Sequence, residues 1–371
     1  MNIITFIIPF IVLITLVVFI HEYGHYYFAK KFGVGVTDFS IGFGKEIFGF
    51  NDKSGTRWKF CLIPLGGYVK FFGDRNVFSQ AEQKELLKKY SLKDQKKLFV
   101  VKPIYQRSLV VAAGPFANFL LAIVIFTFIY MFAGKDFTPA KIEAVQENSP
   151  ASIVGLQKND VIHSINDNKV KSIMDISAYV NTSTSKNIKL SVLRNDNEIF
   201  FNITPVVIDG KDSLGNEIKK KILGVKLVPL FDEFNKEKLG PTKALYYAIK
   251  ETWFVTTSSL KFIISLFKGS GDTSQLGGPI KIAKITGQVA QYGIIAFLSI
   301  TAYISISLGL INLFPIPMLD GGHLMFYAFE KILGRPLTQK TQEGFFRIGL
   351  VLLFSLMFFT TFNDLKYIGL F

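Results

Sequence analysis

Cysteine is nearly absent from this sequence, since Cys61 is the only one among 371 residues. A single thiol excludes an intramolecular disulfide and any zinc site built from several cysteines. Histidine is almost as scarce, with four residues in the whole chain. A metal site that uses imidazole must therefore draw on a very small set of side chains.

Charge is also in short supply. Only 19% of the residues are charged, whereas a soluble domain usually carries about a quarter. Hydrophobic residues make up 49% of the chain, Phe alone occurs 38 times, and the mean hydropathy is +0.34. This composition excludes a disordered or fibrous chain and indicates an integral membrane protein.

Four uncharged runs are long enough to predict membrane-spanning helices. The first begins at the N-terminus and continues into His21 and Glu22, without the basic start and small-residue cleavage site of a signal peptide. It is therefore predicted to be a retained helix. The four runs cover 3–20, 108–133, 285–319 (helical from about 293) and 348–363.

The basic residues predict the orientation of these helices in the membrane. Residues 30–107 hold 16 Lys/Arg against 7 Asp/Glu, and 331–347 hold 4 against 1. Residues 134–245 are nearly balanced, at 16 against 14, as expected for a translocated domain. We expect both termini outside and the basic loops in the cytoplasm, near anionic membrane lipid. The net charge of +14 then needs no nucleic-acid partner.

The outer segment alternates short apolar runs with turn residues, which is typical of a small β-rich domain. The order Ser149-Pro150-Ala151, Gly155-Leu156 and Asp160-Val161-Ile162 resembles a PDZ domain, a module that binds an extended peptide at a sheet edge. We place it at 135–207. An unrelated small β-domain is the alternative.

The sharpest motif is His21-Glu22-Tyr23-Gly24-His25, at the cytoplasmic end of the first helix. Residues four apart share one helix face, so both imidazoles can reach one metal ion. Glu22 lies beside them, where a carboxylate can take a proton from water at the metal. The alternative is a polar cluster satisfied between helices, although ionisable groups at membrane depth usually serve a function.

A catalytic zinc needs a third protein ligand and one open position. His163 lies in the predicted outer domain and receives no role, while His323 is read as an interfacial histidine with a possible supporting or gating part. Asp320 follows an uncharged helix that Pro315 and Pro317 interrupt. Irregular backbone at membrane depth must be buried or line a cavity, so Asp320 is the best candidate. A helix N-cap is the alternative for Asp320.

Together, the motif at residues 21–25 and the segment Asn312-x-x-Pro-x-Pro-x-Leu-Asp-Gly321 resemble the site-2 protease family of intramembrane zinc metalloproteases, peptidase family M50. The order of segments is similar to the bacterial regulator-of-sigma-E protease branch, with one PDZ-like copy where many relatives have two. Further matching pieces are 64–70, 113–118 and 277–280.

The resemblance implies that His21, His25 and Asp320 bind Zn²⁺ and that Glu22 is the catalytic base. It also implies substrate contact for Asn312, with an amide that holds the helix break as an equal alternative. Residues 39–50 and 59–72 are predicted to form membrane-associated β-hairpins that present an edge to an unwound substrate; a packing loop is the alternative.

The predicted fold is a polytopic α-helical membrane protein with four transmembrane helices, membrane-associated β-hairpins and one inserted PDZ-like α+β domain. The predicted function is cleavage of single-span membrane proteins, such as anti-sigma factors already trimmed outside or remnant signal peptides, in a bacterial inner membrane. The predicted segments are 1–30, 31–107, 108–134, 135–207, 208–290 (linker and amphipathic surface helix), 291–330 and 331–371.

Two other functions compete with proteolysis. A peptide-binding membrane scaffold with a structural zinc requires a closed four-ligand site, and no fourth ligand is evident from the sequence. A metal or ion transporter usually has internal repeats and more spans, and neither is found. Glu22 beside two metal ligands favours the protease.

Overall fold

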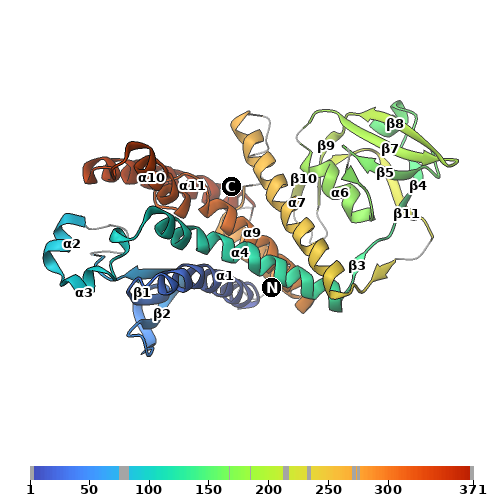
Figure 1. Cartoon of the computed structure of the whole chain (residues 1–371). Coiled ribbons are helices and arrows are strands. Elements are labelled where there is room, and N and C mark those ends of the chain that lie inside the picture. Colours follow the sequence, from blue (N-terminus) through green and yellow to red (C-terminus); the bar gives the residue numbers. More distant parts are fainter. Residues whose placement is uncertain are drawn as a thin grey trace. The chain divides into compact units, whose positions relative to one another are not determined.

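The computed structural model describes residues 4–74, 83–166, 168–183, 185–211, 217–231, 235–269, 273 and 276–367. The chain divides into two compact units, one formed by Met1–Ile125 with Gly277–Phe371 and the other by Phe126–Leu276. Figure 1 shows a helical first unit and a second unit in which a sheet is accompanied by helices.

Long helices build the first unit. Four of them are long and apolar enough to cross a membrane, over Thr5–Lys31, Ile104–Phe132, Ile294–Asn312 and Gln339–Tyr367. The chain is therefore a membrane protein with four candidate spans, as the uncharged runs predict. The helices are α1 (Ile4–Lys31), α2 (Gln83–Lys89), α3 (Leu92–Gln95), α4 (Ile104–Phe132), α8 (Pro279–Ala290), α9 (Ile294–Asn312), α10 (Asp320–Leu333) and α11 (Gln339–Tyr367), and a 3-10 turn covers Phe99–Val101.

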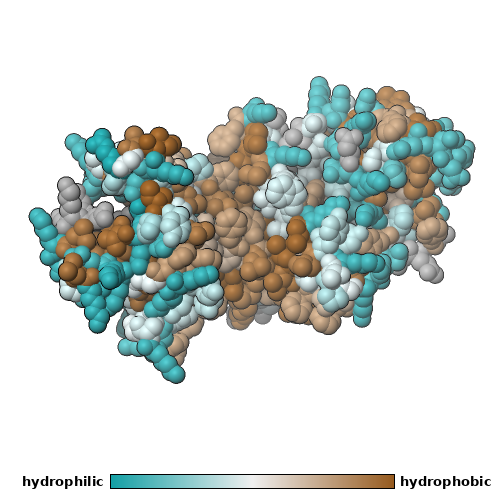
Figure 2. Space-filling view, in the orientation of Figure 1, coloured by the Kyte–Doolittle hydropathy of each residue, from teal (hydrophilic) through white to brown (hydrophobic). Residues whose placement is uncertain are grey.

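The apolar surface of this unit follows from its sequence. In Figure 2, hydrophobic side chains gather over α1, α4 and α9. Pro9 and Pro115 lie inside α1 and α4, a position that costs little in membrane helices because neighbouring groups satisfy the freed carbonyls. The last helix starts at Gln339, nine residues before the predicted run at 348, because polar residues extend it beyond the apolar segment.

A twisted β-hairpin follows α1, with strands β1 (Val36–Asn51) and β2 (Arg57–Phe71). Residues 38–41 of β1 pair both with 57–60 and with 67–70 of β2, so the start of β1 lies between the two ends of β2. At the turn, the carboxylate of Asp52 accepts hydrogen bonds from the backbone N–H groups of Ser54 and Thr56. This matches the predicted hairpin and its turn.

The second unit is built on a sheet with strand order β11-β4-β5-β7-β8, and β6 pairs with β5. Its core consists of aliphatic side chains such as Ile142, Ile165 and Leu190, all fully buried. The elements are β3 (Lys135–Asp136), β4 (Ala140–Val145), α5 (Pro150–Ile153), β5 (Val161–Ile165), β6 (Asn168–Lys169), α6 (Ile173–Thr182), β7 (Ile188–Arg194), β8 (Asn197–Ile203), β9 (Val206–Lys211), β10 (Glu217–Ile222), β11 (Val225–Pro229), β12 (Lys236–Glu237) and α7 (Pro241–Phe267).

The domain boundary predicted at residue 207 is too early. Strand β11 pairs with β4 at the edge of the same sheet, and Leu223 belongs to the same core. This strand is hard to predict from the sequence, because the four charges in residues 217–222 are not typical of a segment next to a buried strand. Beyond it, α7 is amphipathic as predicted for 250–268, although it begins at Pro241.

Candidate metal centre

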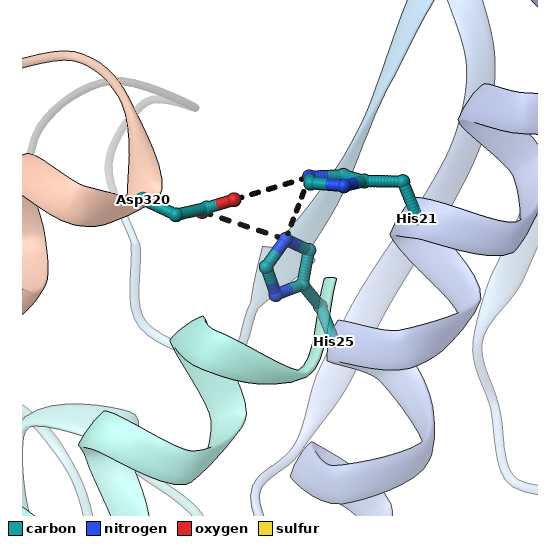
Figure 3. Close-up of side chains that lie close together, drawn as sticks. All are labelled: His21, His25 and Asp320. Carbon is teal, nitrogen blue, oxygen red and sulfur yellow. Dashed lines mark hydrogen bonds and ion pairs between the residues drawn. The ribbon is translucent and has the colours of Figure 1, made fainter. Parts of the chain in front are cut away.

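Three side chains from two distant parts of the chain meet inside the first unit. His21 Nε2 lies 3.1 Å from Asp320 Oδ2, and His25 Nε2 lies 3.5 Å from Asp320 Oδ1. The two imidazole nitrogens are 3.2 Å apart. Figure 3 shows both histidines projecting from α1 toward the carboxylate at the start of α10, so that their polar atoms form a triangle.

The size of this triangle fits a metal ion. In a tetrahedral site with metal–ligand bonds of about 2.0–2.1 Å, neighbouring ligand atoms lie about 3.3 Å apart. The three separations observed here, 3.1 to 3.5 Å, bracket that value. Among the described residues the cluster contains three such ligand groups, which leaves one tetrahedral position for a substrate or water.

Helix α4 orients the His25 ring. The Nδ1–H group of His25 donates to the backbone carbonyl of Val110 at 2.9 Å, which leaves Nε2 unprotonated and directed at the triangle. One turn later, Gly114 permits close approach. A Cβ atom at Gly114 would lie 2.3 Å from His25 Nε2 and 2.9 Å from His21 Cε1. The glycine is thus required for the two rings to lie against α4.

Asn118, one further turn along α4, contacts the His21 ring. Its amide nitrogen is 3.2 Å from His21 Nδ1, while Asn118 Oδ1 is buried without a hydrogen-bond partner among the described residues. The two ends of an amide are nearly isosteric. Turning this amide by 180° lets Oδ1 accept from Nδ1–H, which leaves His21 Nε2 free to bind a metal and moves the amide nitrogen to the other, unpartnered position.

Asp320 is placed by an unusual turn between α9 and α10. Met318 has a φ angle of 89°, which a non-glycine residue rarely adopts. A Cβ atom at Gly321 would lie 2.2 Å from the carbonyl oxygen of Phe314, so glycine is needed there. Asp320 is the first residue of α10 rather than its N-cap, which is Leu319, and its carboxylate faces the histidines. The N-cap alternative is therefore wrong.

Glu22 and Asn312 border the triangle. The Glu22 side chain is 8% exposed, and a Cβ atom at Gly67 of β2 would lie 3.0 Å from its Cγ. The amide nitrogen of Asn312, the last residue of α9, is 3.4 Å from His21 Nε2. The Asn312 amide thus contacts a ring nitrogen that faces the triangle, and Glu22 follows His21 on α1. Their roles in catalysis and substrate contact remain predictions.

The two remaining histidines do not join the cluster. His163 lies on β5 in the second unit. His323 is on α10, where its ring lies 5.8 Å from that of Phe346 on α11, in keeping with an interfacial histidine. Sequence reasoning missed the orienting roles of Val110, Gly114 and Asn118, although the segment 113–118 carried part of the family resemblance.

A His–His–Asp donor set among apolar helices is the arrangement that a metal-binding membrane protein would use. The pattern of peptidase family M50 matches residues 9–356 of this chain. The chain belongs to that family and is a zinc metalloprotease, so Zn²⁺ is its metal.

Relatives match along almost the whole length. "Putative zinc metalloprotease Atu1380" of Agrobacterium fabrum is 39% identical over 97% of this chain and 96% of its own length. A protein of Mesorhizobium japonicum with the same description (mll0638) is 38% identical over 96% and 98%. "Metalloprotease MmpA" of Caulobacter vibrioides is 33% identical over 95% and 93%.

Among the solved structures, one match is to a single domain. The PDZ domain of an SdrC-like protein from Listeria monocytogenes covers 25% of this chain and 90% of its own length, at 22% identity and a TM-score of 0.20. These values establish no shared fold, and the PDZ-like nature of the second unit stays a prediction from its sequence.

Proposed function

We propose that this zinc metalloprotease hydrolyses a peptide bond within or near the transmembrane segment of single-span membrane proteins. The observation that carries the proposal is the donor triangle of His21, His25 and Asp320 with Glu22 beside it, on helices apolar enough to span a membrane. A protease centre in this setting acts on a segment that enters the membrane.

In this proposal each residue has a defined part. Zn²⁺, when bound by His21, His25 and Asp320, supplies Lewis-acid polarisation of the scissile carbonyl and acidifies a water molecule. The Glu22 carboxylate accepts a proton from that water and delivers it to the leaving amine nitrogen. The Asn312 side-chain N–H donates to the developing oxyanion or to the substrate backbone.

The β-hairpin supports a way to hold the substrate. A helix keeps its backbone hydrogen bonds internal, so it must unwind before a peptide bond is attacked. Residues 67–70 of β2 pair with β1, and a Cβ atom at Gly67 would lie 3.0 Å from Glu22 Cγ. We propose that an unwound substrate segment pairs along this part of β2, which satisfies N–H and C=O groups that cost several kcal/mol each in lipid.

The family resemblance and the charge pattern extend the proposal to the cell. We place the enzyme in a bacterial inner membrane, with the metal centre toward the cytoplasm and the PDZ-like unit outside. Substrates would be anti-sigma factors or remnant signal peptides, in regulated intramembrane proteolysis. The PDZ-like unit would bind or exclude their trimmed outer ends.

The test compares Glu22→Gln and Asp320→Ala with the wild type in detergent, measuring bound zinc and cleavage of a single-span model substrate. His163→Ala is the matched control, because it removes a histidine away from the cluster. We expect Glu22→Gln to keep zinc and lose cleavage, Asp320→Ala to lose both, and the control to keep both. Cleavage by Glu22→Gln would exclude Glu22 as the base.

A further inference from the structure

A buried ion pair joins α4, which orients the histidines, to α10, which carries Asp320. Arg107, near the start of α4, donates from Nη1 and Nη2 to the carboxylate oxygens of Glu330 on α10, at 3.0 and 2.6 Å. The two side chains are only 10% and 15% exposed. Burying two charges is costly, and apolar residues of similar size often serve stability as well or better. The pair therefore calls for a role other than stability.

Arg107 is held more rigidly than the ion pair requires. Its Nε donates to the carbonyl oxygen of Lys102 at 2.9 Å, and its guanidinium lies 4.9 Å from the centre of the Tyr327 ring. Three kinds of contact thus fix one planar group. Lysine cannot reproduce them, since its single ammonium has neither the two-pronged geometry nor the flat face.

The pair lies on the same face of α10 as the metal-facing carboxylate. Asp320, Leu324, Tyr327 and Glu330 follow one another at spacings of four, three and three residues, which is one helical stripe. Leu324 and Tyr327 pack on the core that contains Val110. Asp320 and Glu330 are thereby placed at the two ends of one packed stripe, about 15 Å apart by helical rise.

Helix α10 needs an anchor at its far end. Its near end connects to α9 through an irregular turn with two prolines, and a helix on such a connection can tilt or rotate. At the far end, Arg107 lies three residues before Val110, the residue whose carbonyl orients His25. One turn of α4 therefore orients His25 through the Val110 carbonyl. The same turn acts on Asp320 through the bond between Arg107 and Glu330.

We propose that Arg107 and Glu330 are positioning residues that lock α10 against α4, so that Asp320 stays at bonding distance from the metal. The inference rests on the proposed role of Asp320 as a ligand. Neither Arg107 nor Glu330 belongs to the motifs that supply the proposed ligands. The proposal therefore adds the ion pair between them as a further requirement for metal binding.

The experiment measures zinc affinity by competition with a chelator, on the full-length protein in detergent. Arg107→Lys and Glu330→Gln are each expected to weaken zinc binding about 10-fold or more, the range seen when outer-shell partners of metal ligands are removed. Absorption of bound Co²⁺ should change as well, because the carboxylate shifts. Arg194→Lys is the matched control: Arg194 pairs in the same two-pronged way with Asp160 in the second unit, and its change should leave zinc affinity unaltered.

A second arm separates positioning from general stability. The double variant Arg107→Met/Glu330→Leu should unfold thermally at or above the wild-type temperature and yet bind zinc as weakly as the single variants. Unchanged affinity in the single variants, or wild-type zinc affinity in the stable double variant, overturns the proposal. Failure of the wild type itself to bind zinc would instead refute the proposed ligand set.

Discussion

Gly114 is the residue on which the packing of both histidines depends most directly. Its missing side chain leaves room for the His25 and His21 rings, which would otherwise be 2.3 and 2.9 Å from a Cβ atom. Real Cβ contacts are not that short, so a side chain here must displace a ring. The consequence for metal binding can be measured without any substrate.

We predict that Gly114→Ala weakens zinc binding about 10-fold or more, because it moves the rings away from their partners on α4. Zinc retained after dialysis against a chelator is the measurement. Gly344→Ala on α11 is the control, since a Cβ atom there would meet nothing within 4 Å. If Gly114→Ala holds zinc as tightly as the control, the rings do not pack as described.

Asp52 is a second residue with a testable signature. Burial raises the pKa of its carboxyl group, but hydrogen bonds from Ser54, Thr56, Tyr26 and Trp58 outweigh this and hold the pKa well below the usual range. A lowered pKa in the folded state contributes stability that is present above the unfolded value of about 3.9 and lost as pH falls below it.

The wild-type hairpin should therefore loosen in acid, below about pH 4. We predict that Asp52→Asn is less stable than the wild type at pH 7 and that the difference shrinks below pH 4. Fluorescence of Trp58, measured with Trp253 changed to Phe, reports on the turn. If the wild type and Asp52→Asn lose stability equally as the pH falls, the Asp52 carboxylate does not stabilise the turn.

At the scale of elements, a buried carboxylate joins α8 to α11. Asp364 on α11 is fully buried and accepts hydrogen bonds from the backbone N–H groups of Gly278, Ile280 and Lys281. These groups lie at the start of α8, where N–H groups have no partner within the helix. A side chain 84 residues away thus caps this helix, as the bond to Ile280 shows.

We predict that Asp364→Ala lowers the free energy of unfolding by roughly 2–4 kcal/mol, since it leaves several buried donors unpaired. Asp364→Asn should be intermediate, because its amide oxygen can still accept. Ser355→Ala, at an exposed position on the same helix, should be nearly neutral. Thermal unfolding in detergent provides the comparison.

The elements that could be predicted from the sequence are those with a periodic pattern or a long uncharged run. The four spans, the hairpin around Asp52, and the meeting of residues 21–25 with Asp320 all follow from local pattern and from the cost of polar groups at membrane depth. Neither β11 nor the cap by Asp364 could be predicted, because a strand or a cap that completes a distant element has no local signature. Val110 was also hidden, since it acts through its backbone carbonyl and any residue type has one.

At the scale of the whole molecule, the counts of basic residues predict which side of the membrane each loop faces. The fold alone does not determine this orientation. We predict that Lys158→Cys, exposed in the second unit, reacts with a membrane-impermeant maleimide added to intact cells. Lys93→Cys and Arg335→Cys should react only after lysis. The buried Cys61 is replaced by Ser throughout. Labelling of Arg335→Cys in intact cells would reverse the assigned orientation.

The long separation of the ligands along the chain has a consequence for biogenesis. His21 and His25 leave the ribosome early, whereas Asp320 follows about 300 residues later. At synthesis rates of about 5–20 residues per second, the nascent chain holds only two of the three donors for roughly 15–60 s. Truncated products released in that interval would lack hydrolytic power. A chain cut short before residue 320 therefore lacks one of the three donors, so the set is complete only when synthesis is nearly finished.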